Sequence, residues 1–86
     1  MAKKQSVFDF GNGPVPAHQH ANGGGWVANT ALAQKDAYID SGARVYGVAQ
    51  VLNGAQLWDE VQVYDKAIVH SGVDLSGSFR VFGRTD

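Results

Sequence analysis

The chain has 86 residues, 44% of them apolar and 17% charged, and its net charge is −1. This length allows one small domain, and the composition is too apolar for a disordered chain, while its apolar residues are too evenly spread for a membrane protein. The lack of a basic excess argues against nucleic-acid binding, and the lack of cysteines excludes disulfides, thiolate metal ligands and thiol catalysis.

Residues 1–24 predict an extended arm. Pro14 and Pro16 exclude a helix, and Phe8 and Phe10 would point to the same side of an extended segment. An arm of this length cannot form a core alone, so we expect it to be mobile in the isolated protein and to bind a partner through the two phenylalanines. No apolar run of signal-peptide length follows its basic start, which predicts a protein used without secretion.

The arm also contains His18 and His20, whose spacing would bring both imidazoles to one side of an extended strand. A third ligand such as Asp9 could complete a metal site, but hydrogen bonding of the imidazoles to the glycine-rich backbone is the simpler interpretation. The glycine-rich stretches 11–13 and 23–25 lead into no helix, so no phosphate loop is expected. We therefore predict no metal and no cofactor.

A six-residue repeat follows the arm. Every sixth residue is apolar: Val27, Ala33, Ile39, Val45, Val51, Leu57, Val63, Val69, Leu75 and Val81. The residue two positions earlier is usually small. A helix cannot keep this period on one face, whereas a short strand points both series inward and leaves the residue between them outside. Three strands with their corners make a triangular coil of 18 residues, in which each strand pairs in parallel with the strand 18 residues later.

This pattern resembles that of the hexapeptide-repeat family, the left-handed parallel β-helices with a branched aliphatic residue at every sixth position. The resemblance covers ten hexads, residues 25–84. It implies an all-β fold, a left-handed parallel β-helix of about three coils over residues 25–86, with the extended N-terminal arm before it. It also implies a homotrimer of prisms packed side by side. The segment from His18 to Ala31 is similar to the lead-in of short family members encoded by phages and prophages.

Residues 18 positions apart should stack in columns on the outer faces. One face carries an aromatic column, Tyr46, Tyr64 and Phe82, beside Arg44 and Arg80. We expect the rings either to cover the sheet by mutual stacking or to contact a protein or glycan partner, since exposed aromatics near arginines suit recognition.

A second face carries Leu32, Leu52 and Ile68, together with His70. A monomer would expose this apolar stripe, so we predict that these four residues form the oligomer interface. The family resemblance offers another role for His70, because acyltransferases of this family use an interface histidine as a general base. Those enzymes generally have longer helices and inserted loops that hold an acyl-carrier arm, and ten unbroken hexads contain no such insertion.

The sequence thus predicts a non-catalytic structural or interaction protein rather than an enzyme. The phage-like lead-in favours a trimeric virion accessory, such as a capsid decoration or tail-associated protein, anchored through its N-terminal arm and located in a virion or the host cytoplasm. No nucleic-acid or membrane partner is expected. Two alternatives stay open. One is a phage-encoded module that binds a small ligand or host factor between subunits near Gln34, Gln50 and His70, and the other is a minimal acyltransferase.

Overall fold

The structure is a computed structural model that describes residues 6–11 and 13–83. These residues form strands and turns, with no helix among them. The first strands are β1 (Val7–Asp9) and β2 (Pro14–Gln19). The repeat supplies β3 (Trp26–Ala28), β4 (Leu32–Ala33), β5 (Tyr38–Ile39), β6 (Arg44–Val45), β7 (Gln50–Val51), β8 (Gln56–Leu57), β9 (Gln62–Val63), β10 (Ile68–Val69), β11 (Asp74–Leu75) and β12 (Arg80–Val81).

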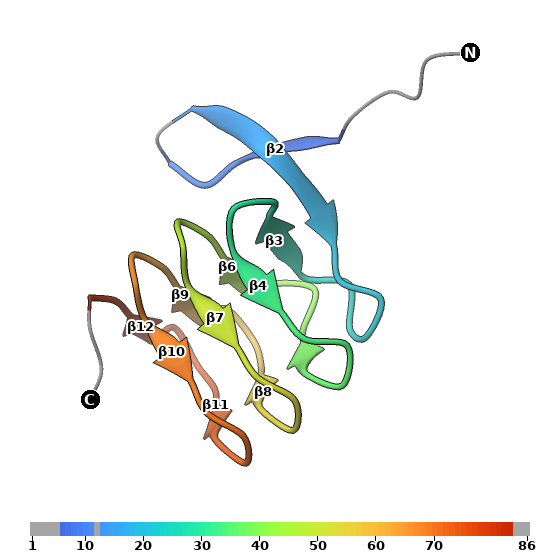
Figure 1. The fold of residues 1–86 in the computed structure, drawn as a ribbon, viewed down its shortest axis with the longest axis vertical. Helices are drawn as coiled ribbons and strands as arrows, with labels where there is room; N and C mark the ends of the chain where they lie inside the picture. Colours follow the sequence, from blue (N-terminus) through green and yellow to red (C-terminus); the bar gives the residue numbers. More distant parts are fainter. Residues whose placement is uncertain (1–5, 12, 84–86) are drawn as a thin grey trace.

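The repeat strands stack into the three sides of a β-solenoid (Figure 1). Its sheets have the strand orders β3-β6-β9-β12, β4-β7-β10 and β5-β8-β11, and the pairing within each is parallel. Val27 pairs with Val45 and Val45 with Val63, so each coil advances by 18 residues. This confirms the predicted all-β coil of about three turns. The left hand that the family resemblance implies stays a prediction.

Both inward-pointing series of the repeat form the core, as the six-residue period predicts. The members from the middle coils are fully buried, with 0% exposure: Ala37, Ile39, Ala43, Val45, Ala49, Val51, Ala55, Leu57, Val61, Val63 and Ala67. Burying an aliphatic side chain of Val or Leu size contributes about 1.5–3 kcal/mol. A column of such residues therefore holds successive coils together although the repeat strands after β3 are only two residues long.

Side chains at the corners tie one coil to the next. The Asp40 carboxylate accepts the backbone N–H of Asp59 at 2.9 Å, and the Asp59 carboxylate accepts that of Gly77 at 3.0 Å. Asp59 has a positive φ of 57°, and Asp65 at another corner has one of 59°. Aspartate tolerates this conformation better than most residues, and every other position with a positive φ in the described chain is a glycine.

The N-terminal segment differs from the expected free arm. β1 and β2 pair antiparallel, with Phe8 opposite Val15, and β2 pairs antiparallel with β3, with His18 opposite Val27. The hairpin thereby extends one sheet of the solenoid (Figure 1). Mobility of this segment in the isolated protein stays a prediction, but its described residues pair with the first coil, which the sequence analysis does not predict. The physical reason is that β3 would otherwise present an open strand edge, which β2 satisfies.

The loop after β2 closes the N-terminal end of the core. His20 is 7% exposed, and its Nε2 donates to the Gln34 carbonyl oxygen at 2.9 Å while its Nδ1 accepts the Asn22 N–H at 3.1 Å. The Asn22 side-chain amide donates to the Ala37 carbonyl oxygen at 3.1 Å. These side chains bond to carbonyl oxygens of the first coil, so polar groups of the loop cover the apolar core at this end.

The last described coil is more open. Phe79 is 49% exposed, whereas Ala43 and Val61 occupy the same inward position in the two preceding coils and are fully buried. Leu75 and Val81 are half-buried, in contrast to their counterparts in the middle coils. Burial along one column therefore depends on whether a further coil lies over it.

Candidate functional site

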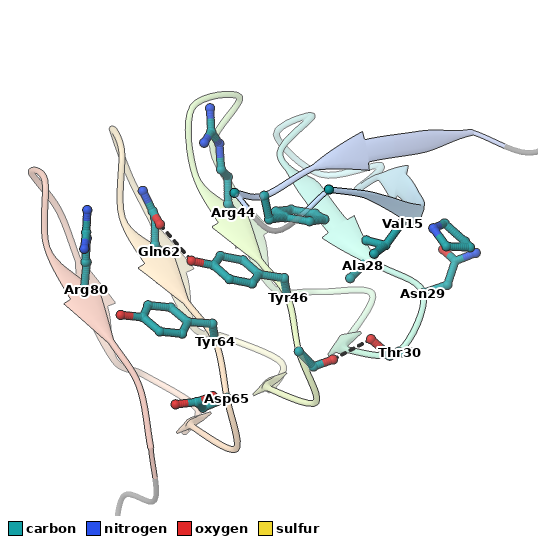
Figure 2. A pocket seen from close by; sticks show the side chains of 15 residues that line it. Val15, Ala28, Asn29, Thr30, Arg44, Tyr46, Gln62, Tyr64, Asp65 and Arg80 are labelled. Atoms are coloured by element: carbon teal, nitrogen blue, oxygen red, sulfur yellow. Dashed lines mark hydrogen bonds between the residues drawn. The ribbon is translucent and has the colours of Figure 1, made fainter.

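The candidate site is a groove of about 750 Å³ on the sheet formed by β3, β6, β9 and β12 (Figure 2). The hairpin of β1 and β2 closes one end of it, and the solenoid strands supply the rest. It is lined by Phe10, Gly11, Gly13, Val15, Pro16, Ala28, Asn29, Thr30, Arg44, Tyr46, Gly47, Gln62, Tyr64, Asp65 and Arg80. Because these strands are parallel and in register, residues far apart in the sequence stand in straight columns across the groove.

One of these columns is a stack of aromatic rings. Tyr46 and Tyr64 stack with their centroids 4.9 Å apart and their planes at 5°, and Tyr64 stacks on Phe82 at 5.3 Å and 13°. The strand spacing of about 4.8 Å equals a ring-stacking distance, so the parallel register alone produces the column. The predicted mutual stacking is confirmed. Contact of these rings with a partner stays a prediction.

The hairpin adds a ring to this column where the first coil has none. In the first coil, the residue in the column of Tyr46 and Tyr64 is Ala28, which is buried and has no ring. Phe10 of the hairpin stacks on Tyr46 instead, with the ring centroids 4.8 Å apart. Phe8 stacks on Trp26 at 4.8 Å, and the Arg44 guanidinium lies 5.1 Å from the centroid of Phe8. Both phenylalanines predicted to reach a partner therefore pack against the solenoid itself.

The two long edges of the groove are polar. Figure 2 shows Arg44, Gln62 and Arg80 along one edge, and Thr30 and Asp65 along the other. The Tyr46 hydroxyl donates to Gln62 Oε1 at 3.0 Å, and the Thr30 hydroxyl donates to the Gly47 carbonyl oxygen. These hydrogen bonds hold the Tyr46, Gln62 and Thr30 side chains in place. The guanidinium groups of the two arginines lie at the margin of the groove.

The environment of Tyr46 keeps its hydroxyl protonated. Burial among the neighbouring rings raises the pKa of Tyr46 above its usual value, and the neighbouring Tyr64 and Asp65 raise it further, while Arg80 and Arg44 act in the opposite direction. At neutral pH the Tyr46 phenol is therefore neutral, and its proton is available for the hydrogen bond to Gln62 Oε1.

The residues predicted to form the oligomer interface lie on the sheet of β4, β7 and β10. Leu32 is 46% exposed and shares a column with Ile68. Leu52 is half-buried and His70 is exposed, each directly after a strand of the same sheet. The structure thus places all four residues on one face, separate from the groove, and their contact with another subunit stays a prediction.

A third face holds an aromatic pair to which the sequence analysis assigned no role. Tyr38 and Trp58 lie 4.5 Å apart, and the Trp58 indole N–H donates to Gln56 Oε1 at 3.2 Å. The Tyr38 hydroxyl donates to the Asp40 carboxylate at 3.4 Å. Burial and this carboxylate raise the pKa of Tyr38. The pair is smaller than the groove column and lies outside the groove.

The sequence also missed the polar edges and the hairpin wall of the groove. The sequence places Arg44 and Arg80 beside the rings, but it gives Asp65 and Val15 no part in the site. Gln62 belongs to the column of residues 18 positions apart that also holds Arg44 and Arg80. Val15 gives no such signal, because it belongs to the hairpin and reaches the groove only through the pairing of β2 with β3.

The two histidines of the N-terminal segment do not share a site. His20 is buried and bonds to backbone groups, as the simpler interpretation expected, whereas His18 is exposed and its Nδ1 lies 2.7 Å from Asn29 Oδ1. Within residues 6–11 and 13–83, no three histidine or acidic side chains gather in an arrangement that could hold a metal ion.

Comparison with known proteins found no matching family model, no matching curated protein and no matching solved structure. The resemblance to hexapeptide-repeat proteins therefore depends on the repeat pattern. The described part of the chain contains no helix of sufficient length and apolar character to cross a membrane.

Proposed function

We propose that this protein is a non-catalytic interaction protein that binds a partner protein through the groove on the sheet of β3, β6, β9 and β12. The observation that carries this proposal is the combination of a stacked aromatic column with two guanidinium groups along one edge of a groove of about 750 Å³. Tryptophan, tyrosine and arginine are enriched among the few residues that supply most of the binding energy in protein interfaces.

The proposed partner is a larger assembly such as a phage virion, on which the protein would serve as a capsid decoration or tail-associated accessory. This part of the proposal is supported by the similarity of residues 18–31 to the lead-in of phage-encoded family members. The hairpin changes the proposed mode of anchoring. Phe10 and Val15 contribute a fixed wall to the groove, so attachment would use the groove and not a free arm.

We further propose that the protein acts as a homotrimer through the face that carries Leu32, Leu52, Ile68 and His70. The support is the exposed apolar area of this face, which costs free energy in water. A double variant, Leu52→Glu with Ile68→Glu, should convert a trimer into monomers in light scattering. An unchanged trimer would assign the interface to another face.

The acyltransferase alternative has less support. It needs His70 as a general base, and in the described residues no carboxylate is hydrogen-bonded to His70 to orient its imidazole. Binding of coenzyme A that is lost on His70→Ala would favour this alternative over the interaction protein.

Site-specific cross-linking tests the proposed groove. A photoreactive amino acid at Tyr64, in the groove, is compared with the same amino acid at Trp58, on another face, in particles purified from a producing cell. We expect a cross-link to one particle protein from position 64 and none from position 58. Equal cross-linking from both positions, or no particle-associated protein at all, would contradict the proposal.

A further inference from the structure

The two arginines of the groove stand in one column. Arg44 pairs in register with Gln62, and Gln62 with Arg80, so their Cα atoms are two strand steps apart, about 9.6 Å. Arg44 is held by its contact with the Phe8 ring, and Arg80 is exposed at the end of the column. Across the described chain, neither guanidinium takes part in a salt bridge. The groove thus has two cations at a fixed spacing, and the one carboxylate of its lining, Asp65, forms no salt bridge with either of them.

The aromatic column strengthens this preference for anions. An aromatic ring has a negative face and a positive edge. Because Phe10, Tyr46, Tyr64 and Phe82 stack face to face, their negative faces cover one another and their edges point outward. The Tyr46 hydroxyl donates its one proton to Gln62 Oε1, so it adds no further donor for a ligand. The outward surface of the column is therefore electropositive although tyrosine and phenylalanine are neutral.

The same stacking disfavours two other kinds of ligand. Nucleic-acid bases bind aromatic side chains by stacking on ring faces, and sugars use the same faces. In this column the faces of Tyr46 and Tyr64 are occupied by neighbouring rings at 4.8–5.3 Å. Within the groove lining, which does not include Phe82, ring edges, guanidinium groups and the Gln62 amide stay accessible. Carboxylates and backbone carbonyl groups suit these donors.

We propose that the groove binds an acidic, extended segment of a partner polypeptide, with one carboxylate on Arg44 and a second on Arg80. This inference rests on the proposed function and names the chemistry of its partner. The groove crosses three strand steps from β3 to β12, about 14 Å, which is the length of four to five extended residues. In a polyproline II segment, residues three apart lie on one side and about 9.3 Å from each other, close to the arginine spacing.

The opposite edge of the groove restricts which positions of the segment can carry a negative charge. Asp65 lies across the groove from the arginine column (Figure 2). Its carboxylate repels acidic side chains on that side, because like charges at close range destabilise a complex. The segment should therefore carry acidic residues at every third position and neutral or basic residues between them.

Fluorescence anisotropy with labelled peptides tests this inference. The probe is a peptide of three Glu-Pro-Pro repeats, and the control peptide has three Gln-Pro-Pro repeats. We expect the folded wild-type protein to bind the Glu peptide and not the Gln peptide. Binding should weaken between about 0.1 M and about 1 M salt, where the screening length falls from about 10 Å to about 3 Å.

Matched variants separate the site from the general charge of the protein. Arg80→Glu and Lys35→Glu change the net charge equally, but Lys35 is exposed at a corner outside the groove. Because exposed charge pairs contribute modestly, Arg80→Gln should weaken binding of the Glu peptide about two- to fivefold, with Arg80→Glu weakening it more and Lys35→Glu leaving it unchanged. Circular dichroism verifies that each variant is folded.

Three results would overturn the inference: equal binding of the Glu and Gln peptides, equal weakening by Arg80→Glu and Lys35→Glu, or displacement of the peptide by polygalacturonate or single-stranded DNA at lower concentration than by unlabelled peptide. The last result would assign the groove to another class of polymer. If the Glu peptide fails while a cross-link from position 64 still identifies a particle protein, the proposed function stands and only the acidic chemistry of its partner is wrong.

Discussion

Leu57→Ala tests whether burial inside the solenoid depends on coverage by the next coil. Leu57 is fully buried in the column of the β5, β8 and β11 sheet, paired with Ile39 in the coil before it and with Leu75 in the coil after it. Leu75 is the same residue in the same column, but it is only half-buried because no described coil lies over it. Leu57 and Leu75 therefore differ in whether a described coil lies over them and in little else.

The expected magnitudes follow from this difference. Leu57→Ala removes three carbon atoms, worth about 2.4 kcal/mol at ~0.8 kcal/mol each. A closed column cannot collapse fully around the missing atoms, so a cavity penalty raises the loss of unfolding free energy to about 3–4 kcal/mol. Leu75→Ala removes the same atoms from a site already partly in water. For Leu75→Ala we therefore expect about half of the transfer free energy to be lost and no cavity penalty. The unfolding free energy should fall by about 1 kcal/mol.

Urea unfolding followed by far-ultraviolet circular dichroism measures both values. All proteins are compared at one concentration, since assembly would make stability concentration-dependent. With an m value of about 1 kcal/mol/M, the midpoint should fall by about 3–4 M for Leu57→Ala and by about 1 M for Leu75→Ala. An equal or larger loss for Leu75→Ala would refute the reasoning, because it would mean that the last coil is covered in solution.

Two further predictions concern the corners and the capped end. Asp40 accepts the backbone N–H groups of Ser41 and Asp59, which lower the pKa of its carboxyl, so its contribution to stability should be complete above the unfolded pKa of about 3.9 and lost as pH falls through the lower folded value. Thermal unfolding at several pH values should show a smaller loss on acidification for Asp40→Asn than for wild type, and identical pH profiles would contradict this. Gly25→Ala should destabilise the protein by about 1–3 kcal/mol in urea unfolding, since an added Cβ would lie 2.5 Å from the Asp40 carbonyl oxygen and would also clash with Ile39. An unchanged midpoint would mean that the first coil can move away from the loop.

The sequence alone determined the solenoid. A strict period of six is incompatible with one face of a helix and compatible with short strands and corners, so the inward positions, the 18-residue register and the parallel pairing all followed from residues such as Val45 and Val63. The aromatic column followed as well, because a register of 18 places Tyr46 over Tyr64 whatever the details of the corners.

Only the tertiary structure decided the position of the hairpin and the existence of a groove. Residues 1–24 have no repeat, so no periodicity indicates where they pack. The position of β2 is set by the open edge of β3, a feature that exists only after the first coil has formed. Pairing at that edge brings Phe10 onto Tyr46 and Val15 to the end of the groove. A repeated sequence pattern predicts contacts that recur in every coil. The hairpin makes its contact with the solenoid once, and that contact depends on a strand edge that exists only in the folded coil.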